Sequence, residues 1–473
     1  MHAGYSLAVS VERRIGKFET SLHRNRIFLK SSAKSIAMNV AAWACQSVGV
    51  GLQEFVEMAE WLASQNMHVG DPVESLPNPV FSAHGKKYVS FSTNNYLSLA
   101  TSTRLIDAAR RGLEAYGVGN CESRLLGGNL AIYSELERKL AACKKKDAAV
   151  LFATGYMANL GVLSSLPQTS KYARVCGFTS AREYTYAYFS DELNHISIRE
   201  GIRMSGAARA TYRHLDLNHL EALLKKSTAT TKIIVTDGVF SQDGDIAPLP
   251  DLLQLAERYD TTLYVDDAHG TGILGEHGDG IAEHFGIASE RMIYMGTLSK
   301  AYGGIGGFIA TETHIAQIIR LACSAYGFTS TLPPDQAAAL SEAVDMVRDE
   351  PERRVRLWEN QDYFVTRMSK LPYRLISTVS PIVPILIGDE DAADAFARSL
   401  GEVGIHVDAV RFPAVPLRKA RLRIQLNAGH TKQDIDLLID TLWAHQDYVD
   451  TTTISTRDVT DQKRSELVAS AAF

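Results

Sequence analysis

Between residues 130 and 320 the chain alternates short apolar runs with amphipathic helical segments, and this alternation constrains its fold more than any other feature. The helical segments and the apolar runs that follow them are 133–143 with 148–152, 217–227 with 232–240, and 249–259 with 261–267; two further apolar runs are 291–295 and 306–311. The alternation predicts an α/β fold with a mostly parallel sheet that helices cover on both faces. Ligands of such sheets bind at the carboxyl ends of the strands.

The chain of 473 residues is long enough for more than one domain. A long helical stretch at 334–370 leads to expected strands at 382–388 and 421–427, which predicts a smaller αβ domain near the C-terminal end. The segment 168–188 lacks clear periodicity and is expected to be an inserted loop or hairpin. The predicted parts are a helical extension (1–75), a segment that packs with the small domain (76–125), a large domain (126–345), the small C-terminal domain (346–450) and a mobile tail (451–473).

Composition narrows the class of protein. The net charge of −5 gives no basic excess for binding nucleic acid. Five cysteines lie far apart with no CxxC pair, which favours reduced thiols and a cytoplasmic location. Charged residues interrupt the apolar stretch 36–62, so no membrane span is expected. Residues 11–34 carry seven Lys and Arg against two Glu; a solvated basic helix is favoured there, and a targeting peptide stays open.

Polar groups gather at the expected carboxyl ends of the strands. These groups are His195, Ser241, Asp266, His269, Thr297 and Lys300. The segment 153–159 follows an apolar run and opens a helix, so the backbone N–H groups of Gly155 and Tyr156 are placed to hold a phosphate. An amine, a buried carboxylate, histidines and a phosphate cradle form the set that a pyridoxal phosphate enzyme needs. The amine links to the cofactor aldehyde, and the acid keeps the pyridine nitrogen protonated.

Each of these motifs is weak by itself. An Asp-x-x-His pair such as Asp266 and His269 is more often a structural cap or a pair of metal ligands, and Ser-Lys in a glycine-rich stretch is more often a plain loop. The interpretation therefore depends on the ordered set. Other expectations are that Asp267 faces the opposite side of its strand as a structural hydrogen-bonding residue, that 144–146 is a solvated helix end, that His214 and His219 are surface residues or indirect supports, and that 303–308 packs backbone closely.

Eight sequence blocks between residues 78 and 447 resemble, in the same order, the α-oxoamine synthases, a branch of the fold-type-I pyridoxal phosphate transferases, which are aspartate aminotransferase-like. The blocks are NNYLSLA, TGYMANLGVL, DELNHISIREGIR, TDGVFSQDGDIAPL, YVDDAHGTGILGEHGDG, GTLSKAYGGIGGFIA, TSTLPP and RLRIQLNAGHT. The resemblance implies pyridoxal 5′-phosphate as the cofactor and no metal site. The chain departs from the family at Tyr133, where histidine is usual.

The resemblance also implies a role for each matched residue. Lys300 holds the cofactor and later moves protons, Asp266 pairs with the pyridinium nitrogen, and His269 bonds the phenolic oxygen. His195 stacks on the ring. The remaining implied contacts are Ser241, Thr297 and the amides of Gly155 and Tyr156 near the phenolic oxygen and phosphate, Asn95 in the substrate pocket, Arg423 as the clamp for the amino-acid carboxylate, and Thr329 and Ser330 across the interface of a homodimer with a shared active site.

The implied reaction is a decarboxylative Claisen condensation of a small amino acid with an acyl-CoA or acyl carrier protein thioester. It yields an α-amino ketone, carbon dioxide and a free thiol. The segment 117–130 is slightly similar to serine palmitoyltransferase, and an 8-amino-7-oxononanoate synthase-like specificity stays open. Two further alternatives are a fold-type-I aminotransferase and a non-catalytic regulatory subunit of such a synthase, although a regulatory subunit typically lacks the lysine found here at Lys300.

Overall fold

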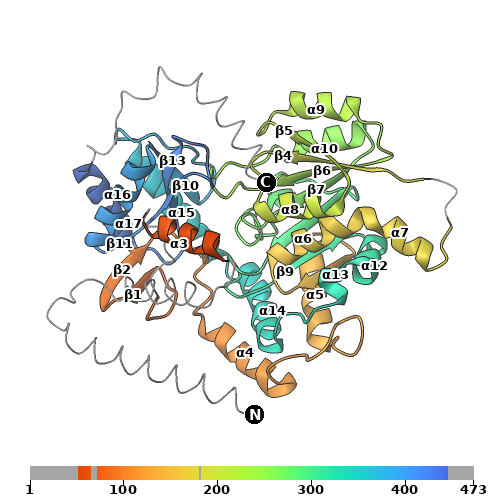
Figure 1. Ribbon diagram of the computed structural model, residues 1–473. Coiled ribbons are helices and arrows are strands. Elements are labelled where there is room, and N and C mark those ends of the chain that lie inside the picture. The colour runs from red at the N-terminus through yellow and green to blue at the C-terminus, as the bar shows by residue number, and fades with distance from the viewer. Residues whose placement is uncertain (1–51, 65–71, 180–182, 446–473) are drawn as a thin grey trace, which may run out of the picture. The chain divides into compact units, whose positions relative to one another are not determined.

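The computed structural model describes residues 52–64, 72–179 and 183–445 (Figure 1). The chain forms two units, Met1–Pro72 and Val73–Phe473. In the first unit, α3 (Gln53–Ser64) is an amphipathic helix, as its spacing of apolar residues predicts, and none of its residues is buried. Most of the expected extension at 1–75, and the whole expected tail at 451–473, lie outside the described residues.

The core of the second unit is a seven-stranded sheet with the order β3-β9-β8-β7-β6-β4-β5. Its strands are β3 (Ala148–Phe152), β4 (Tyr186–Asp191), β5 (Ala208–Tyr212), β6 (Thr231–Asp237), β7 (Thr262–Asp266), β8 (Met292–Thr297) and β9 (Gly307–Thr311). Of these described strands, only β9 runs antiparallel to its neighbours. The mostly parallel sheet predicted from the sequence is therefore confirmed.

Helices cover both faces of this sheet, because successive strand residues point to opposite sides. On β7, Leu263 and Val265 belong to an apolar cluster with residues of α5 (Ala131–Cys143), α9 (Leu217–Lys226) and α10 (Leu249–Arg258). Tyr264, which lies between them, belongs to a second cluster with residues of α6 (Gly155–Ser165), α8 (Ile196–Ser205) and α12 (Thr313–Ala322). Both faces of the sheet are thus covered by apolar side chains. The carboxyl ends of the strands remain available for a ligand-binding site.

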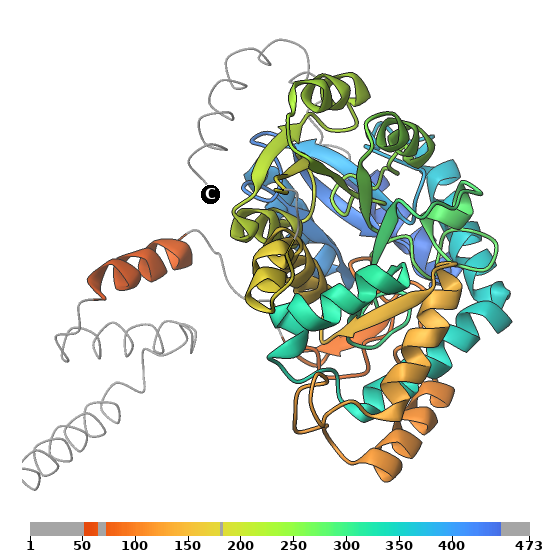
Figure 2. The same ribbon diagram turned by 90° about the vertical axis from the view of Figure 1, so that its right-hand side faces the viewer.

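Helices α4 (Thr103–Tyr116) and α14 (Pro334–Asp349) lie side by side in both views (Figures 1 and 2). A Cβ at Gly112 would lie 2.6 Å from the Cβ of Ala338, so the close crossing requires a glycine. The next helix, α15 (Pro351–Met368), begins at a proline. Because proline favours the first helical position and disfavours helical geometry in the residue before it, the continuous helix predicted at 334–370 is instead two helices.

Two smaller sheets complete the second unit within the described residues. One has the antiparallel order β10-β13-β12, with β10 (Ile382–Gly388), β13 (Ala420–Gln425) and β12 (Asp408–Val410) beside α16 (Glu390–Glu402) and α17 (Lys432–Ala444). In the other, β1 (Val80–Ala83) pairs with β2 (Lys86–Ser90), which pairs with β11 (Ile405–His406). The strands expected at 382–388 and 421–427 are therefore present, and β2 joins the start of this unit to its C-terminal region (Figure 1).

The expected inserted loop or hairpin at 168–188 is wrong. The segment contains a short helix, α7 (Thr169–Val175), and its last residues start the buried strand β4. A helix of about two turns is too short to show a clear apolar period in the sequence. Strands β4 and β5 were not predicted either.

The expectation that the lysines at 144–146 form a solvated helix end is wrong for Lys144 and Lys146, although Lys145 is exposed. The Lys144 side chain is 1% exposed, and its Nζ donates to Oδ2 of Asp267 at 2.6 Å. Lys146 is 4% exposed and donates to Oε1 of Glu312 at 2.6 Å. Long aliphatic stems allow lysines at a helix end to reach buried acids, which a local charge pattern does not reveal. Asp267 is the structural hydrogen-bonding residue that its strand position predicts.

Candidate active site

Lys300 lies in the turn that follows β8, and its amine is the centre of the candidate site. Its Nζ lies 2.7 Å from Nε2 of His269. Burial lowers the pKa of Lys300 to about 8, although the nearby Asp266 carboxylate acts in the opposite direction. An amine with a pKa this close to neutrality is unprotonated in part of the molecules, as a nucleophile must be.

His269 connects Lys300 to a distant part of the chain, because its Nδ1 lies 2.8 Å from the hydroxyl of Tyr96. Burial lowers the pKa of His269 well below its ordinary value, and the charge of Lys300 adds to this effect, so the imidazole is neutral. An ammonium group only donates hydrogen bonds. Nε2 therefore accepts from protonated Lys300, and Nδ1 carries the proton that it donates to Tyr96.

Asp266 ends strand β7, and its carboxylate is held on both oxygens. Asn159 donates to Oδ2 at 2.7 Å, and the amide of Ala268 donates to Oδ1 at 3.0 Å. The hydroxyl of Tyr264 in turn donates to the side-chain oxygen of Asn159 at 2.9 Å, which fixes the orientation of that amide. The sequence did not single out Asn159, although it closes the segment 153–159; its position one helical turn after the Gly155 cradle was the available signal.

His195 is the N-cap residue of α8, and its Nδ1 lies 2.7 Å from Oγ of Ser197. Burial lowers the pKa of His195, while the nearby Asp266 carboxylate opposes this shift. Behind it, the His195 amide approaches Oδ1 of Asp237 at 3.4 Å. Burial raises the pKa of Asp237 well above its ordinary value, and the charge of Asp266 adds to the rise. Asp237 is thus a second acid at the strand ends that the sequence did not single out.

The predicted phosphate cradle lies where α6 begins. The side chain of Thr154 caps this helix by accepting from the amide of Met157 at 3.1 Å. Thr297 faces Gly155, because a Cβ added at Gly155 would lie 3.1 Å from its side chain. A Cβ at Gly307 would lie 2.5 Å from the Gly155 backbone, so the predicted close packing within 303–308 is confirmed. Gly155 and Tyr156 therefore present a helix N-terminus beside a hydroxyl, an arrangement suited to an anion.

Arg423 lies on β13 and reaches the loop after β6. Its Nε donates to the carbonyl oxygen of Ser241 at 2.5 Å. Ser241 thus contacts Arg423 through its backbone. The Arg423 guanidinium also interacts with the Tyr96 hydroxyl, whose pKa burial raises and Arg423 lowers. Arg423, Tyr96, His269 and Lys300 consequently form a continuous chain of polar contacts from the small sheet to the central one.

Three candidate residues have other surroundings. The Asn95 side chain donates to the Pro77 carbonyl at 3.4 Å and accepts from the Ala100 amide at 3.3 Å, so it ties a turn together, and its neighbour Tyr96 reaches His269 instead. The hydroxyl of Thr329 donates to the carbonyl of Ser330 at 3.1 Å, and Ser330 is exposed. A structure of one chain brings neither of these two residues to Lys300.

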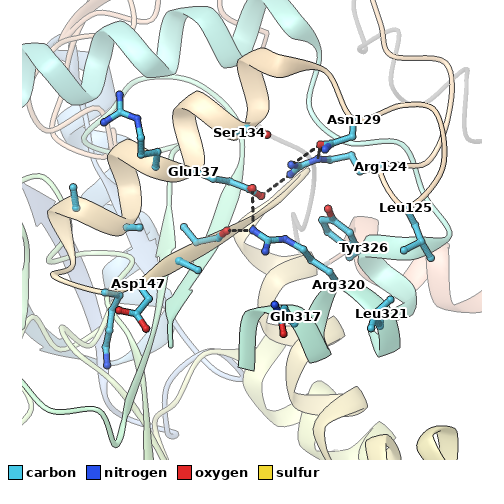
Figure 3. A pocket seen from close by; sticks show the side chains of 16 residues that line it. Arg124, Leu125, Asn129, Ser134, Glu137, Asp147, Gln317, Arg320, Leu321 and Tyr326 are labelled. Atoms are coloured by element: carbon cyan, nitrogen blue, oxygen red, sulfur yellow. Dashed lines mark hydrogen bonds and ion pairs between the residues drawn. The ribbon is translucent and has the colours of Figure 1, made fainter. Parts of the chain in front are cut away.

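A separate cavity of about 880 Å³ lies between α5, α12 and the outer edge of β3, and no candidate residue lines it (Figure 3). There Glu137 pairs with Arg124 at 2.6 Å and with Arg320 at 3.1 Å. Glu137 also accepts from the Leu151 amide at 2.8 Å, and Arg320 donates to the Ala149 carbonyl at 2.8 Å. These side chains satisfy the open edge of β3, which explains the polar lining without a ligand.

The residues at the strand ends fit pyridoxal phosphate. A half-buried amine of lowered pKa lies beside a neutral histidine, and the Asp266 carboxylate, which accepts a hydrogen bond on each oxygen, lies near both. A helix N-terminus with Thr297 is suited to the phosphate. When bound, this cofactor supplies a ring that accepts electrons from the substrate.

In the part of the chain that the structure describes, no helix is long and apolar enough to cross a membrane.

Known proteins are similar to this chain over most of its length. A family model for aminotransferase class I and II matches residues 86–442. Serine palmitoyltransferase from Sphingomonas wittichii has a similar solved structure, with a TM-score of 0.75 and 27% identity over 84% of this chain and 97% of that one. A serine palmitoyltransferase from S. paucimobilis, solved with a pyridoxal phosphate adduct, gives a TM-score of 0.76 and 28% identity over 83% of this chain and 98% of that one. The chain is thus a fold-type-I pyridoxal phosphate transferase.

Sequence relatives narrow this class. The 8-amino-7-oxononanoate synthase 1 of Bacillus subtilis is 41% identical over 78% of this chain and 91% of its own length. The corresponding synthase of Alkaliphilus oremlandii is 39% identical over 81% of this chain and 94% of its own length. The protein belongs to the α-oxoamine synthase family, and it is a pyridoxal phosphate-dependent C-acyltransferase.

Proposed function

We propose that Lys300, His269, Asp266 and His195 carry out the condensation of a small amino acid with an acyl thioester. The observation that supports this most is the partly buried contact of 2.7 Å between Lys300 and His269. It joins the amine of lowered pKa to a histidine that stays neutral. The amine can therefore accept a proton from the substrate α-carbon and return it. In its protonated form it donates a hydrogen bond to Nε2 of His269.

The other candidate residues hold the reacting groups in place. Asp266, fixed by Asn159, balances the protonated pyridine nitrogen, and His195 covers the face of the cofactor ring. Gly155, Tyr156 and Thr297 hold the phosphate, with the Ser241 loop beside the ring. The Arg423 guanidinium interacts with Tyr96 and offers its remaining N–H groups to the substrate carboxylate.

The second substrate is an acyl-CoA or an acyl carrier protein thioester. The sequence relatives favour a specificity like that of 8-amino-7-oxononanoate synthase, and the structural neighbours keep a specificity like that of serine palmitoyltransferase as a second candidate. An aminotransferase is disfavoured because the relatives named above are synthases. A regulatory subunit is disfavoured because Lys300 is present, with a lowered pKa and a contact with His269.

The active enzyme is proposed to be a homodimer with a shared site. Ser330 is exposed and Thr329 is half-buried, and no described contact joins either residue to Lys300 of the same chain. Such a position suits residues that complete the phosphate site of a second subunit. Sedimentation with and without cofactor measures the oligomeric state, and a monomer that is fully active would contradict this part of the proposal.

The test of the function is thiol release from a panel of acyl-CoAs with glycine, alanine or serine and without any keto acid. Mass spectrometry identifies the ketone, with 8-amino-7-oxononanoate and the serine–palmitoyl product as the two specific arms. The expected result is thiol release that depends on the amino acid and is absent in Lys300→Ala, with Lys145→Ala as the matched control at an exposed lysine. Activity that requires a keto acid would show an aminotransferase instead.

A further inference from the structure

The loop after β6 forms a short hairpin, Val239–Ile246, between the central and the small sheet. Val239 and Ile246 pair antiparallel, and the Phe240 amide donates to the Asp245 carbonyl at 3.0 Å. Gly244 near its tip has a φ of 76°, and a Cβ there would collide with the carbonyl oxygen of Ile382 at the start of β10. The hairpin is therefore pressed against the small sheet.

Side chains of β13 and of the segment before β10 hold the tip of this hairpin by three carbonyl oxygens and one carboxylate oxygen. The contacts are Arg423 Nε to the Ser241 carbonyl at 2.5 Å, Arg421 Nη1 to the Gln242 carbonyl at 3.1 Å and to Oδ1 of Asp243 at 2.5 Å, and Ser380 Oγ to the Gly244 carbonyl at 2.6 Å. Because Arg423 uses Nε for this contact, the position of the Ser241 carbonyl, together with the Tyr96 hydroxyl, orients the guanidinium.

His214, in the loop after β5, holds the other side of the same hairpin. Its Nε2 lies 2.7 Å from Oδ2 of Asp245, and its ring stands edge-on to the ring of Phe240 at 4.5 Å. Its Nδ1 lies 3.0 Å from Oδ1 of Asp191, which ends strand β4. The His214 amide donates to Oε1 of Glu192 at 2.8 Å, so the loop itself is fastened to the same strand end.

A carboxylate lies at each ring nitrogen of His214, so both N–H groups of its imidazolium form donate a hydrogen bond. Burial alone would lower its pKa, but the hydrogen bonds of Asp191 and Asp245 outweigh that effect and raise the pKa to about 10. The three acids that face this residue are Asp191, Asp245 and, at its amide, Glu192. His214 therefore stays protonated throughout the physiological pH range.

We propose that His214 is a positioning residue for amino-acid binding, which fastens the Val239–Ile246 hairpin to the end of β4 and thereby sets the orientation of Arg423. This inference rests on the proposed function, in which Arg423 binds the substrate carboxylate. The path has two contacts: His214 with Asp245 at one side of the hairpin, and the Ser241 carbonyl with Arg423 at the other. His214 touches neither Lys300 nor His269 in any described contact, so the expected effect is on the carboxylate and not on the amine.

The test compares His214→Phe with the wild type in the cofactor-loaded protein. Phenylalanine keeps an edge-on aromatic contact with Phe240 and removes both hydrogen bonds. The matched control is His219→Phe, which removes the bond from the Arg213 amide to Nδ1 of His219 (3.0 Å in the structure) five residues along the same segment. Calorimetry measures the dissociation constants of glycine, alanine and serine, and of methylamine, ethylamine and ethanolamine, the matched amines without a carboxylate.

The expected result for His214→Phe is about 10-fold weaker binding of the best amino acid, with binding of its matched amine changed less than about twofold. KM for the amino acid rises more than kcat falls. His219→Phe changes the dissociation constant of neither the amino acid nor its matched amine. Equal losses for amino acid and amine, or no loss for either, would overturn the proposal. A wild type that binds the amine as tightly as the amino acid would instead refute the role of Arg423, which is part of the proposed function.

Asp245→Asn is the second variant if His214→Phe does not fold, because it keeps the shape of the bridge and removes one charge. Its expected loss is specific for the amino acid, and the loss in the double variant is no larger than in His214→Phe alone. Hydrogen exchange of the cofactor-free protein is a readout without catalysis. The amides of Phe240 and Gly244 exchange faster in His214→Phe than in the control, and unchanged protection would count against the bridge.

Discussion

Replacing Lys144 by methionine tests how the structure supports the candidate acid. Lys144 Nζ donates to Oδ2 of Asp267 at 2.6 Å, to Oγ1 of Thr271 at 2.8 Å and to the Asp279 carbonyl at 2.5 Å. Both partners of the ion pair are 1% exposed. Methionine fills the volume of the aliphatic part of Lys144. It leaves the buried carboxylate of Asp267, the neighbour of Asp266, without a counter-charge. Breaking a buried pair in this way costs about 3–5 kcal/mol of folding free energy.

Equilibrium unfolding in urea measures this cost at about pH 8, with Lys145→Met at the adjacent exposed position as the control, expected within about 0.5 kcal/mol of the wild type. The pKa of Asp267 is already raised by burial, and Lys144 holds it down, so the variant raises it further. A raised carboxyl pKa in the folded state means that stability is lost as the pH rises through it. The deficit therefore shrinks from about pH 8 to about pH 5. A deficit below about 1 kcal/mol, or one that grows on acidification, would refute the reasoning.

Three further predictions concern the candidate site. In the cofactor-free protein, labelling of Lys300 by an amine reagent becomes half-maximal near its pKa of about 8 and rises with pH as the neutral amine forms; half-labelling at the value of surface lysines would contradict this. Tyr96→Phe removes the contact of 2.8 Å with His269 and is expected to lower kcat about 10-fold while cofactor affinity is kept, as steady-state kinetics and cofactor titration measure. Asn159→Leu leaves Oδ2 of Asp266 without its donor and is expected to weaken cofactor binding about 10-fold, measured by fluorescence titration; unchanged affinity would count against the assigned role of Asp266.

The sequence revealed most of the strands that are buried on both faces, but not β4. Strands β7 and β8 are continuous apolar runs with a polar residue at the carboxyl end, so their place in the sheet and the position of Asp266 followed directly. Strand β5 was missed because it is the edge strand, and most of its residues are exposed or half-buried. Strand β4 was missed because the weakly periodic segment before it hid its start.

The supporting residues of the candidate site could not be predicted from the sequence, for a different reason. Tyr96 and His269 are 173 positions apart, and Asn159 and Asp266 are 107 positions apart. Only the folded sheet brings such pairs together, and no local spacing records them. The same holds for Lys144, whose charge pattern resembles a solvated helix end until Asp267 is placed beside it. The residues expected to carry out the chemistry can be predicted because they lie at strand ends. The residues that support them can be identified only from contacts in the folded protein.

Reduction of the cofactor-loaded protein with borohydride, followed by peptide mapping, tests most directly whether Lys300 carries the cofactor. The account predicts that the tryptic peptide with Lys300 bears the reduced cofactor mass in stoichiometric amount and that Lys300→Ala bears none. An unlabelled Lys300 in fully loaded protein, or the same mass on a different lysine, would contradict it.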